Sequence, residues 1–257
     1  MATAGGIALF VPRYGILSPR TAHAAIAVDQ TSTTTTQDNV GTSFNLNSFG
    51  SLPAVGSCVI VAGFGWNAAG FDVVSVGDNQ GNSYTVIKHS GYNGNNEKPF
   101  IAYALNVNSS GTFTPSIVNL YSSGNYVVCN AISFTGIVTS LAQDQTAEST
   151  PGSGTSSSVT SGSTTQADEL VIASNAISQS GDTNLNITTP TSGYTDICIE
   201  QDFVAHATGN AAYKIVAATG AQSASWGHDS ANHAAIILTL KAFTGGTGFG
   251  RRKSIVW

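Results

Sequence analysis

Short apolar stretches recur along the chain, some alternating with polar residues and some continuous, and Gly, Asn, Ser and Pro separate them. In 100–107 the larger apolar side chains occupy every second position, so they share one face of an extended strand. In 58–62 every residue is apolar, as in a strand covered on both faces. Helical periodicity is almost absent, and the pattern predicts an all-β chain. The predicted strands are 40–49, 57–66, 71–76, 84–89, 99–107, 112–120, 125–135, 155–160, 168–175, 194–199, 211–217, 222–226 and 233–242.

The strands suggest a faint internal repeat. Segments 58–64, 100–105, 116–120 and 126–134 are followed at similar intervals by 170–176, 211–217, 222–226 and 232–240. Two similar four-strand units predict an antiparallel β-sandwich, or jelly roll, of two Greek-key-like halves. Generic β patterning would give a similar spacing, so a true repeat and a chance one both stay open.

This β-sandwich is expected to span 24–242 as one domain, with an N-terminal arm over 1–23 and an extended C-terminal arm over 243–257. The polar tracts 31–36 and 146–165 are rich in Ser and Thr. We expect solvated loops or edge strands there; attachment of O-glycans is the alternative.

Charge is scarce and unevenly distributed. Charged residues make up 9% of the chain, against about 25% in an average soluble domain. Four lysines and all 14 acidic residues lie within 24–242, which gives this body a net charge of −10. The arms carry the other five basic residues. Because affinity for phosphates needs clustered Lys and Arg, the body is not expected to bind nucleic acid.

Cys58, Cys129 and Cys198 are an odd number of cysteines in separate segments. We expect buried free thiols, with one disulfide plus one free thiol as the alternative. No apolar run approaches the ~18 residues of a transmembrane helix, so no membrane partner is expected. A cleaved signal peptide is not expected either, because the arginines follow the apolar stretch 5–11 instead of preceding it.

The best candidate for catalysis is Glu200 with Asp202, which would share one face of a strand as in jelly-roll β-glucanases. Glycoside hydrolysis needs two carboxyl groups about 5–9 Å apart. The third acid of that family is missing here, where Val204 and Ala205 stand and His206 follows. A solvent-facing strand end is the favoured interpretation, so no catalytic residue is predicted.

The sequence indicates metal and sugar sites even more weakly than it indicates catalysis. On a turn, His228 and His233 around Asp229 could converge on a metal ion, with His206 as a third ligand; a simple hairpin turn is favoured. Segment 78–82 could cap a calcium ion, but Gly81 favours a tight turn. No metal or cofactor is therefore predicted. The aromatic candidates for sugar stacking, each expected to be a core residue instead, are Trp66, Tyr92, Tyr121 and Trp226.

Four segments together resemble a module of phage virion proteins and large bacterial surface proteins. They are 78–85 (DNQGNSYT), 102–106 (AYALN), 133–136 (SFTG) and 167–171 (ADELV). The resemblance covers about 50–242 and implies a fold; it carries over no catalytic residue. Large surface proteins hold this module within long multidomain chains. Here it stands between two short arms, which fits a virion building block better.

The first hypothesis is therefore a non-enzymatic structural protein of a bacteriophage virion: a capsid decoration, tail or adsorption component. Its partners would be further copies of itself and other virion proteins. The alternative is a glycan-binding or adhesive module at the cell surface or outside the cell, and a polysaccharide-active enzyme is a third possibility. Surface glycans are then further possible partners.

The arms link this hypothesis to assembly. They contain many apolar residues, which are a liability in a free tail. We expect the arms to dock on neighbouring subunits, with apolar anchors providing burial and basic residues pairing with the acidic body; packing on their own sandwich is the alternative. The expected contacts are Phe10, Arg13, Tyr14, Arg20, Arg251, Arg252, Lys253 and Trp257.

Overall fold

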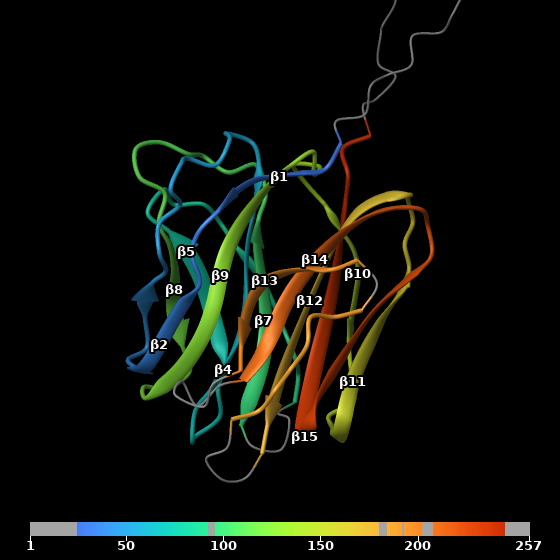
Figure 1. Cartoon of the computed structure of the whole chain (residues 1–257). Helices are drawn as coiled ribbons and strands as arrows, with labels where there is room; N and C mark the ends of the chain where they lie inside the picture. Colours follow the sequence, from blue (N-terminus) through green and yellow to red (C-terminus); the bar gives the residue numbers. More distant parts are fainter. Residues whose placement is uncertain (1–24, 92–95, 180–183, 192, 202–207, 245–257) are drawn as a thin grey trace, which may run out of the picture.

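The computed structural model describes residues 25–91, 96–179, 184–191, 193–201 and 208–244, and these contain strands and no helix. The predicted all-β, antiparallel fold is thus confirmed (Figure 1). In the described ranges no helix is long and apolar enough to span a membrane. The strands are β1 (Ala27–Thr31), β2 (Thr35–Val40), β3 (Phe44–Asn45), β4 (Cys58–Trp66), β5 (Val73–Asp78), β6 (Thr85–Lys88), β7 (Glu97–Ala104), β8 (Pro115–Leu120), β9 (Asn125–Thr135), β10 (Gln143–Glu148), β11 (Gly152–Ser163), β12 (Asp168–Ser178), β13 (Thr195–Glu200), β14 (Thr208–Ala217) and β15 (Ala221–Lys241).

Two large sheets pack face to face as a β-sandwich (Figure 1). The first sheet has the order β1-β9-β4-β7-β6, with β2 also paired to β9. The second has the order β10-β15-β12-β14-β13, with β11 also paired to β15. A small sheet, β3-β8-β5, covers the outside of the first sheet through a shared apolar cluster. Each half of the chain therefore forms one of the two large sheets.

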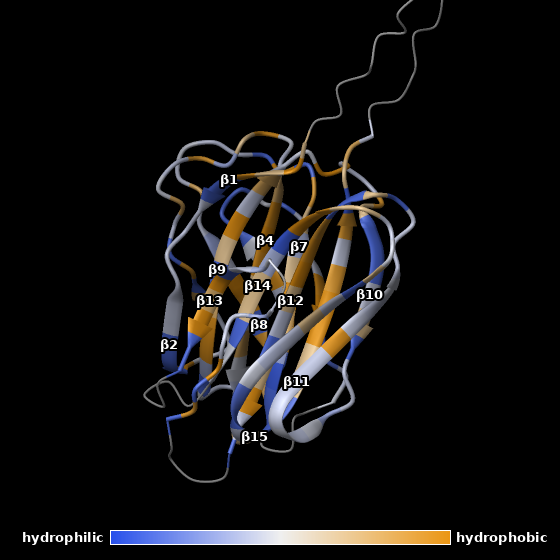
Figure 2. Cartoon of the chain, turned by 45° about the vertical axis from the view of Figure 1, so that its right-hand side comes forward, coloured by the Kyte–Doolittle hydropathy of each residue, from blue (hydrophilic) through white to orange (hydrophobic). Residues whose placement is uncertain are grey.

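Apolar side chains fill three layers, and the central one joins the two halves. Ile60 and Phe64 of β4 meet Ile172 of β12 and Leu238 of β15 there. Figure 2 shows the apolar residues concentrated in the central strands, whereas β10 and β11 are mostly polar. The first outer layer lies between the first sheet and the small sheet. The second outer layer lies between the second sheet and the hairpin that β11 forms with the first part of β15. Burial in these layers is the main source of stability.

The sheets approach closely at two glycines. Ser174 Oγ donates a hydrogen bond to the carbonyl oxygen of Gly63, 2.9 Å away, across the central layer. A Cβ on Gly209 would lie 2.2 Å from the Asn175 carbonyl oxygen and 2.9 Å from the Phe64 ring. Glycine is therefore required at 209, because Phe64 occupies the space that a larger residue would need.

The internal repeat is present at the level of strand register. Ile60 of β4 pairs with Ile132 of β9, and Ile172 of β12 pairs with Leu238 of β15 in the equivalent place. The edge hairpins correspond as well, because each pairs a threonine with a tyrosine. These pairs are Thr85 with Tyr103 and Thr195 with Tyr213. In both halves the last strand returns beside the first, as in a Greek key.

A polar motif is also duplicated. The sequence Asp-Gln-Thr begins at Asp29 on β1 and at Asp144 on β10, and a register irregularity interrupts both strands there. The Gln30 amide donates to Ser133 Oγ at 3.0 Å, and the Gln145 amide donates to Thr239 Oγ1 at 3.1 Å. The same sequence thus makes the same hydrogen bond twice, which indicates that the two halves share one structural plan.

Some predicted boundaries were wrong. The predicted strands 222–226 and 233–242 are one strand, β15, and the turn expected between them is a bulge. There the partner register shifts from Gly154 opposite Ala231 to Ser156 opposite Gly227. Predicted strand 40–49 is reduced to the end of β2 and the short β3. In the tract 31–36, residues 32–34 lie between β1 and β2, whereas most of 146–165 belongs to β10 and β11. The tracts were expected to be solvated loops or edge strands, and they contain both.

Candidate functional site

The end of the sandwich where the arms leave is the first candidate site. β1 begins and β15 ends there, since Ala27 pairs with Thr135 and the Phe243 amide donates to the Gly136 carbonyl at 2.7 Å (Figure 1). The loop before β4 is tied to the same end, because the Ala54 amide donates to Asp29 Oδ2 at 2.6 Å. All eight predicted assembly residues lie outside the described ranges.

Exposed apolar side chains border this end. Leu141, in the loop between β9 and β10, is 89% exposed and has a φ of 51°, in the left-handed region that a leucine rarely adopts. Five of the nine exposed large hydrophobic residues of the described chain belong to this group. We name it the arm-end rim: Val28, Leu52, Val55, Leu141 and Phe243.

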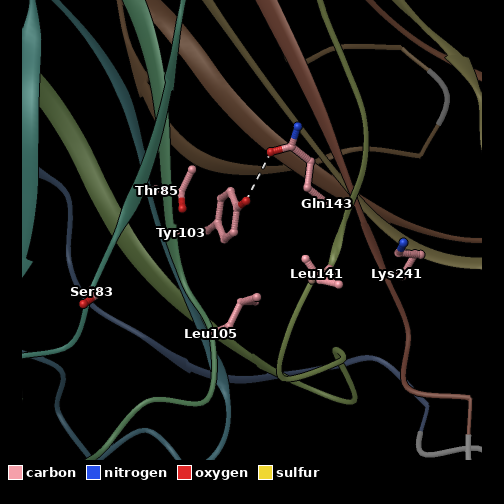
Figure 3. A pocket seen from close by; sticks show the side chains of 8 residues that line it. Ser83, Thr85, Tyr103, Leu105, Leu141, Gln143 and Lys241 are labelled. Carbon is pink, nitrogen blue, oxygen red and sulfur yellow. Dashed lines mark hydrogen bonds between the residues drawn. The ribbon is translucent and has the colours of Figure 1, made fainter.

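A cavity of about 500 Å³ opens between the sheets near Leu141 (Figure 3). Thr85 and Tyr103 line it from the first sheet, and Gln143 and Lys241 from the second. The Tyr103 hydroxyl donates to Gln143 Oε1 at 3.1 Å. Because Tyr103 is 8% exposed, its ring offers little face for sugar stacking.

Of the catalytic candidates, only Glu200 lies within the described ranges. β13 ends at Glu200, which lines a surface hollow with Asn184, Asn186, Ile199 and Gln201. Asp202 and His206 lie outside the described ranges. Among the residues that are described, no three His, Cys, Asp or Glu side chains form a group that could hold a metal ion.

His228 and His233 do come together, on the bulged part of β15 instead of on a turn. The planes of their rings are inclined at 61° to each other, and the ring centroids are 5.3 Å apart. His228 Nδ1 lies 2.8 Å from the Asp229 carbonyl oxygen. Burial, with His228 nearby, lowers the pKa of His233, and a contact with the Ala231 backbone partly opposes this shift.

The candidate calcium segment and the candidate sugar-stacking residue Trp226 have structural roles. Asp78 Oδ1 accepts hydrogen bonds from the amides of Gln80 and Asn82, and Gly81 has a φ of 77°, so this segment is the expected tight turn. Trp226 is buried and donates from Nε1 to Asn210 Oδ1 at 3.0 Å.

Trp66 packs partly buried against the central layer, whereas Tyr121 is 70% exposed and is not a core residue. Tyr92 lies outside the described ranges. All three cysteines are buried and free, which confirms the expected thiols.

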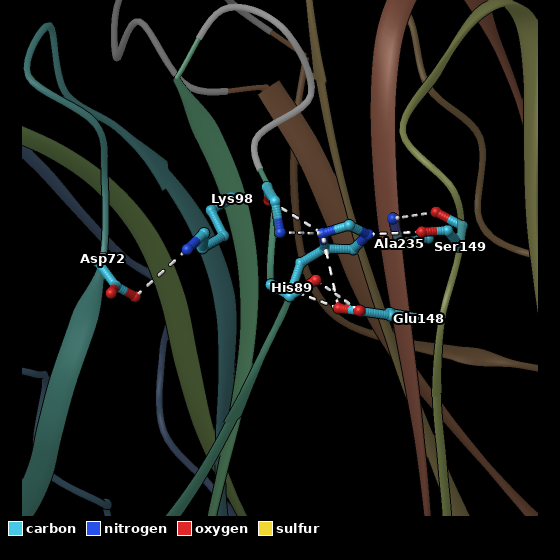
Figure 4. Close-up of polar contacts among 8 residues, drawn as sticks. Asp72, His89, Lys98, Glu148, Ser149 and Ala235 are labelled. Carbon is cyan, nitrogen blue, oxygen red and sulfur yellow. Dashed lines mark hydrogen bonds and ion pairs between the residues drawn. The ribbon is translucent and has the colours of Figure 1, made fainter.

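Two sets of buried ionisable groups were missed from the sequence. His89 connects the halves, because its Nε2 lies 2.7 Å from the Ser149 carbonyl oxygen and its Nδ1 lies 3.7 Å from Glu148 (Figure 4). Glu169 is fully buried against Asp144 and Thr239, and burial, with Asp144 nearby, raises its pKa to about 7. The sequence around His89 and around Glu169 is typical of a strand. Only their contacts with residues distant in the sequence show that these two side chains are unusual.

Comparison with known proteins adds no relative: no family model, curated protein or solved structure matches this chain.

Proposed function

We propose that this chain is a structural subunit of a virion, a capsid decoration, tail or adsorption component, that assembles with copies of itself through its arms. The supporting observation is that both ends of the described body lie at one end of the sandwich, bordered by the arm-end rim. The resemblance to a module of phage virion proteins is the reason for choosing a virion over other assemblies.

Opposite charge and the burial of apolar side chains would both favour binding of the arms to a neighbouring body. The body within 24–242 has a net charge of −10, and the arms carry five basic residues. Opposite charges speed and orient association, whereas apolar burial provides most of the binding energy. The apolar residues of an arm could pack on the arm-end rim, whose own apolar side chains are otherwise exposed to solvent.

The rim can be tested by substitution in the full-length chain. Leu141→Ser and Phe243→Ser remove exposed apolar side chains at the arm end, so we expect weaker self-association in sedimentation velocity. Tyr121→Ser is the matched control: Tyr121 is also exposed but lies just before β9, at the opposite end of the body. Equal self-association of all three variants would contradict the use of the rim.

The virion assignment has its own test. Virus particles purified from cells that produce this chain are expected to contain it in stoichiometric amounts, as measured by mass spectrometry. Its absence from such particles, together with retained self-association, would reject the virion and leave a different assembly.

A further inference from the structure

The second outer layer holds buried polar atoms without partners among the described residues. They are His228 Nε2, His233 Nδ1 and Asn175 Oδ1. His228 is 8% exposed and Asn175 is fully buried. A buried nitrogen or oxygen without a hydrogen bond destabilises a fold, so three of them in one layer need an explanation.

The duplication shows that the fold itself does not require these polar residues. Asn175 and His233 lie on the face of the second sheet that packs under the β11 hairpin, where Asn175 pairs with Ala235 and Ile177 with His233. In the first sheet the equivalent pairs are Gly63 with Cys129 and Gly65 with Val127. The first half thus has Gly63 and Val127 where the second half has Asn175 and His233, in an otherwise apolar layer.

The geometry points to a bound ion: we propose that His228 and His233 bind one divalent transition-metal ion, of the zinc, nickel or copper class. Two imidazoles that share a tetrahedral ion, with metal–nitrogen bonds of about 2.0–2.1 Å, have ring centres about 5 Å apart. The observed separation is 5.3 Å. Neutral imidazole nitrogens favour these metals over magnesium and calcium.

Oxygen ligands would complete the site. Asn175 Nδ2 donates to Ser157 Oγ at 2.9 Å, which leaves its carbonyl oxygen available. His233 and Ser157 also line a cavity of about 430 Å³ whose other lining residues are Ser149, Thr150, Ser156, Ser158 and Ser225. Water can reach an ion from such a polar cavity, so the site does not need a third imidazole or a carboxylate.

The test uses the untagged full-length chain and Zn²⁺ alone, in isothermal titration calorimetry at pH 7.5. We expect one Zn²⁺ per chain, and at least a tenfold loss of affinity in His228→Gln and in His233→Gln. His23→Gln, in the N-terminal arm, is the control and is expected to bind as the wild type does. No saturable binding by the wild type, or undiminished binding by both variants, would overturn the proposal.

A second measurement covers the case in which a variant fails to fold. Long-range ¹H–¹⁵N spectra of the wild type report on each of the five histidines. Zinc is expected to shift the ring signals of His228 and His233. If it shifts only those of His23, His89 or His206, the assigned site is wrong. Neither measurement depends on self-association, so this inference and the proposed assembly can fail separately.

Discussion

Replacing Glu169 by glutamine should stabilise the protein above neutral pH. The Glu169 side chain is fully buried at the start of β12, and burial, with Asp144 nearby, raises its pKa from 4.5 to about 7. The folded state therefore holds this proton up to about pH 7, whereas the unfolded state releases it near pH 4.5. The contribution of Glu169 to the free energy of unfolding is fully present below pH 4.5 and is lost as the pH rises to about 7.

The rise in the pKa of Glu169 from 4.5 to about 7 corresponds to about 3 kcal/mol of unfolding free energy lost at pH 8. Glutamine keeps the shape of the protonated carboxyl group and cannot ionise. Glu169→Gln should therefore gain up to about 3 kcal/mol over the wild type at pH 8 and almost nothing at pH 4.5.

Urea denaturation followed by tryptophan fluorescence at several pH values measures this difference. The matched control is Glu148→Gln. Glu148 is partly exposed, and hydrogen bonds from Ser90 lower its pKa, so its stabilisation is present above the unfolded pKa and is lost on acidification. Glu148→Gln should thus be slightly destabilising at pH 8, the opposite sign. A difference between wild type and Glu169→Gln that does not change with pH would refute this reasoning.

Two further predictions concern the core. Gly209→Ala should destabilise the fold by about 1–3 kcal/mol or more, because the new Cβ meets the Asn175 carbonyl and the Phe64 ring. Gly50→Ala, with nothing within 4 Å of its Cβ, should change the urea midpoint little, and equal effects would contradict the packing argument. No cysteine should react with a thiol reagent in the native state, and all three should react in urea, since burial raises the pKa of every thiol. These thiols are Cys58, Cys129 and Cys198. Rapid native labelling would show that they are accessible.

The central strands could be predicted from the sequence because their apolar residues are continuous or alternate with period two. β4, β7, β9 and β12 are of this kind. β1, β2 and β10 were missed, since they lie toward sheet margins and have few buried apolar side chains. The bulge in β15 was misread as a turn because Asp229 and Ser230 are exposed polar residues, as in a turn.

The duplication was only faintly visible in the sequence, because equivalent residues of the two halves are separated by different numbers of positions. Asp29 and Asp144 are 115 positions apart, whereas Ile132 and Leu238 are 106 apart. Loops of different length between the strands cause this drift, so no single offset aligns the halves. The contact between His228 and His233 depends on the bulge, and the burial of Glu169 depends on pairing with distant strands. Sequence spacing shows neither.

Sedimentation velocity tests the central claim of arm-mediated assembly most directly. The full-length chain is compared with a chain lacking 1–22 and 244–257, while circular dichroism checks that both contain the β-sandwich. We predict that the full-length chain sediments as an oligomer and the truncated chain as a folded monomer. A monomeric full-length chain, whose arms then pack on their own sandwich, or a truncated chain that assembles equally well would contradict the account.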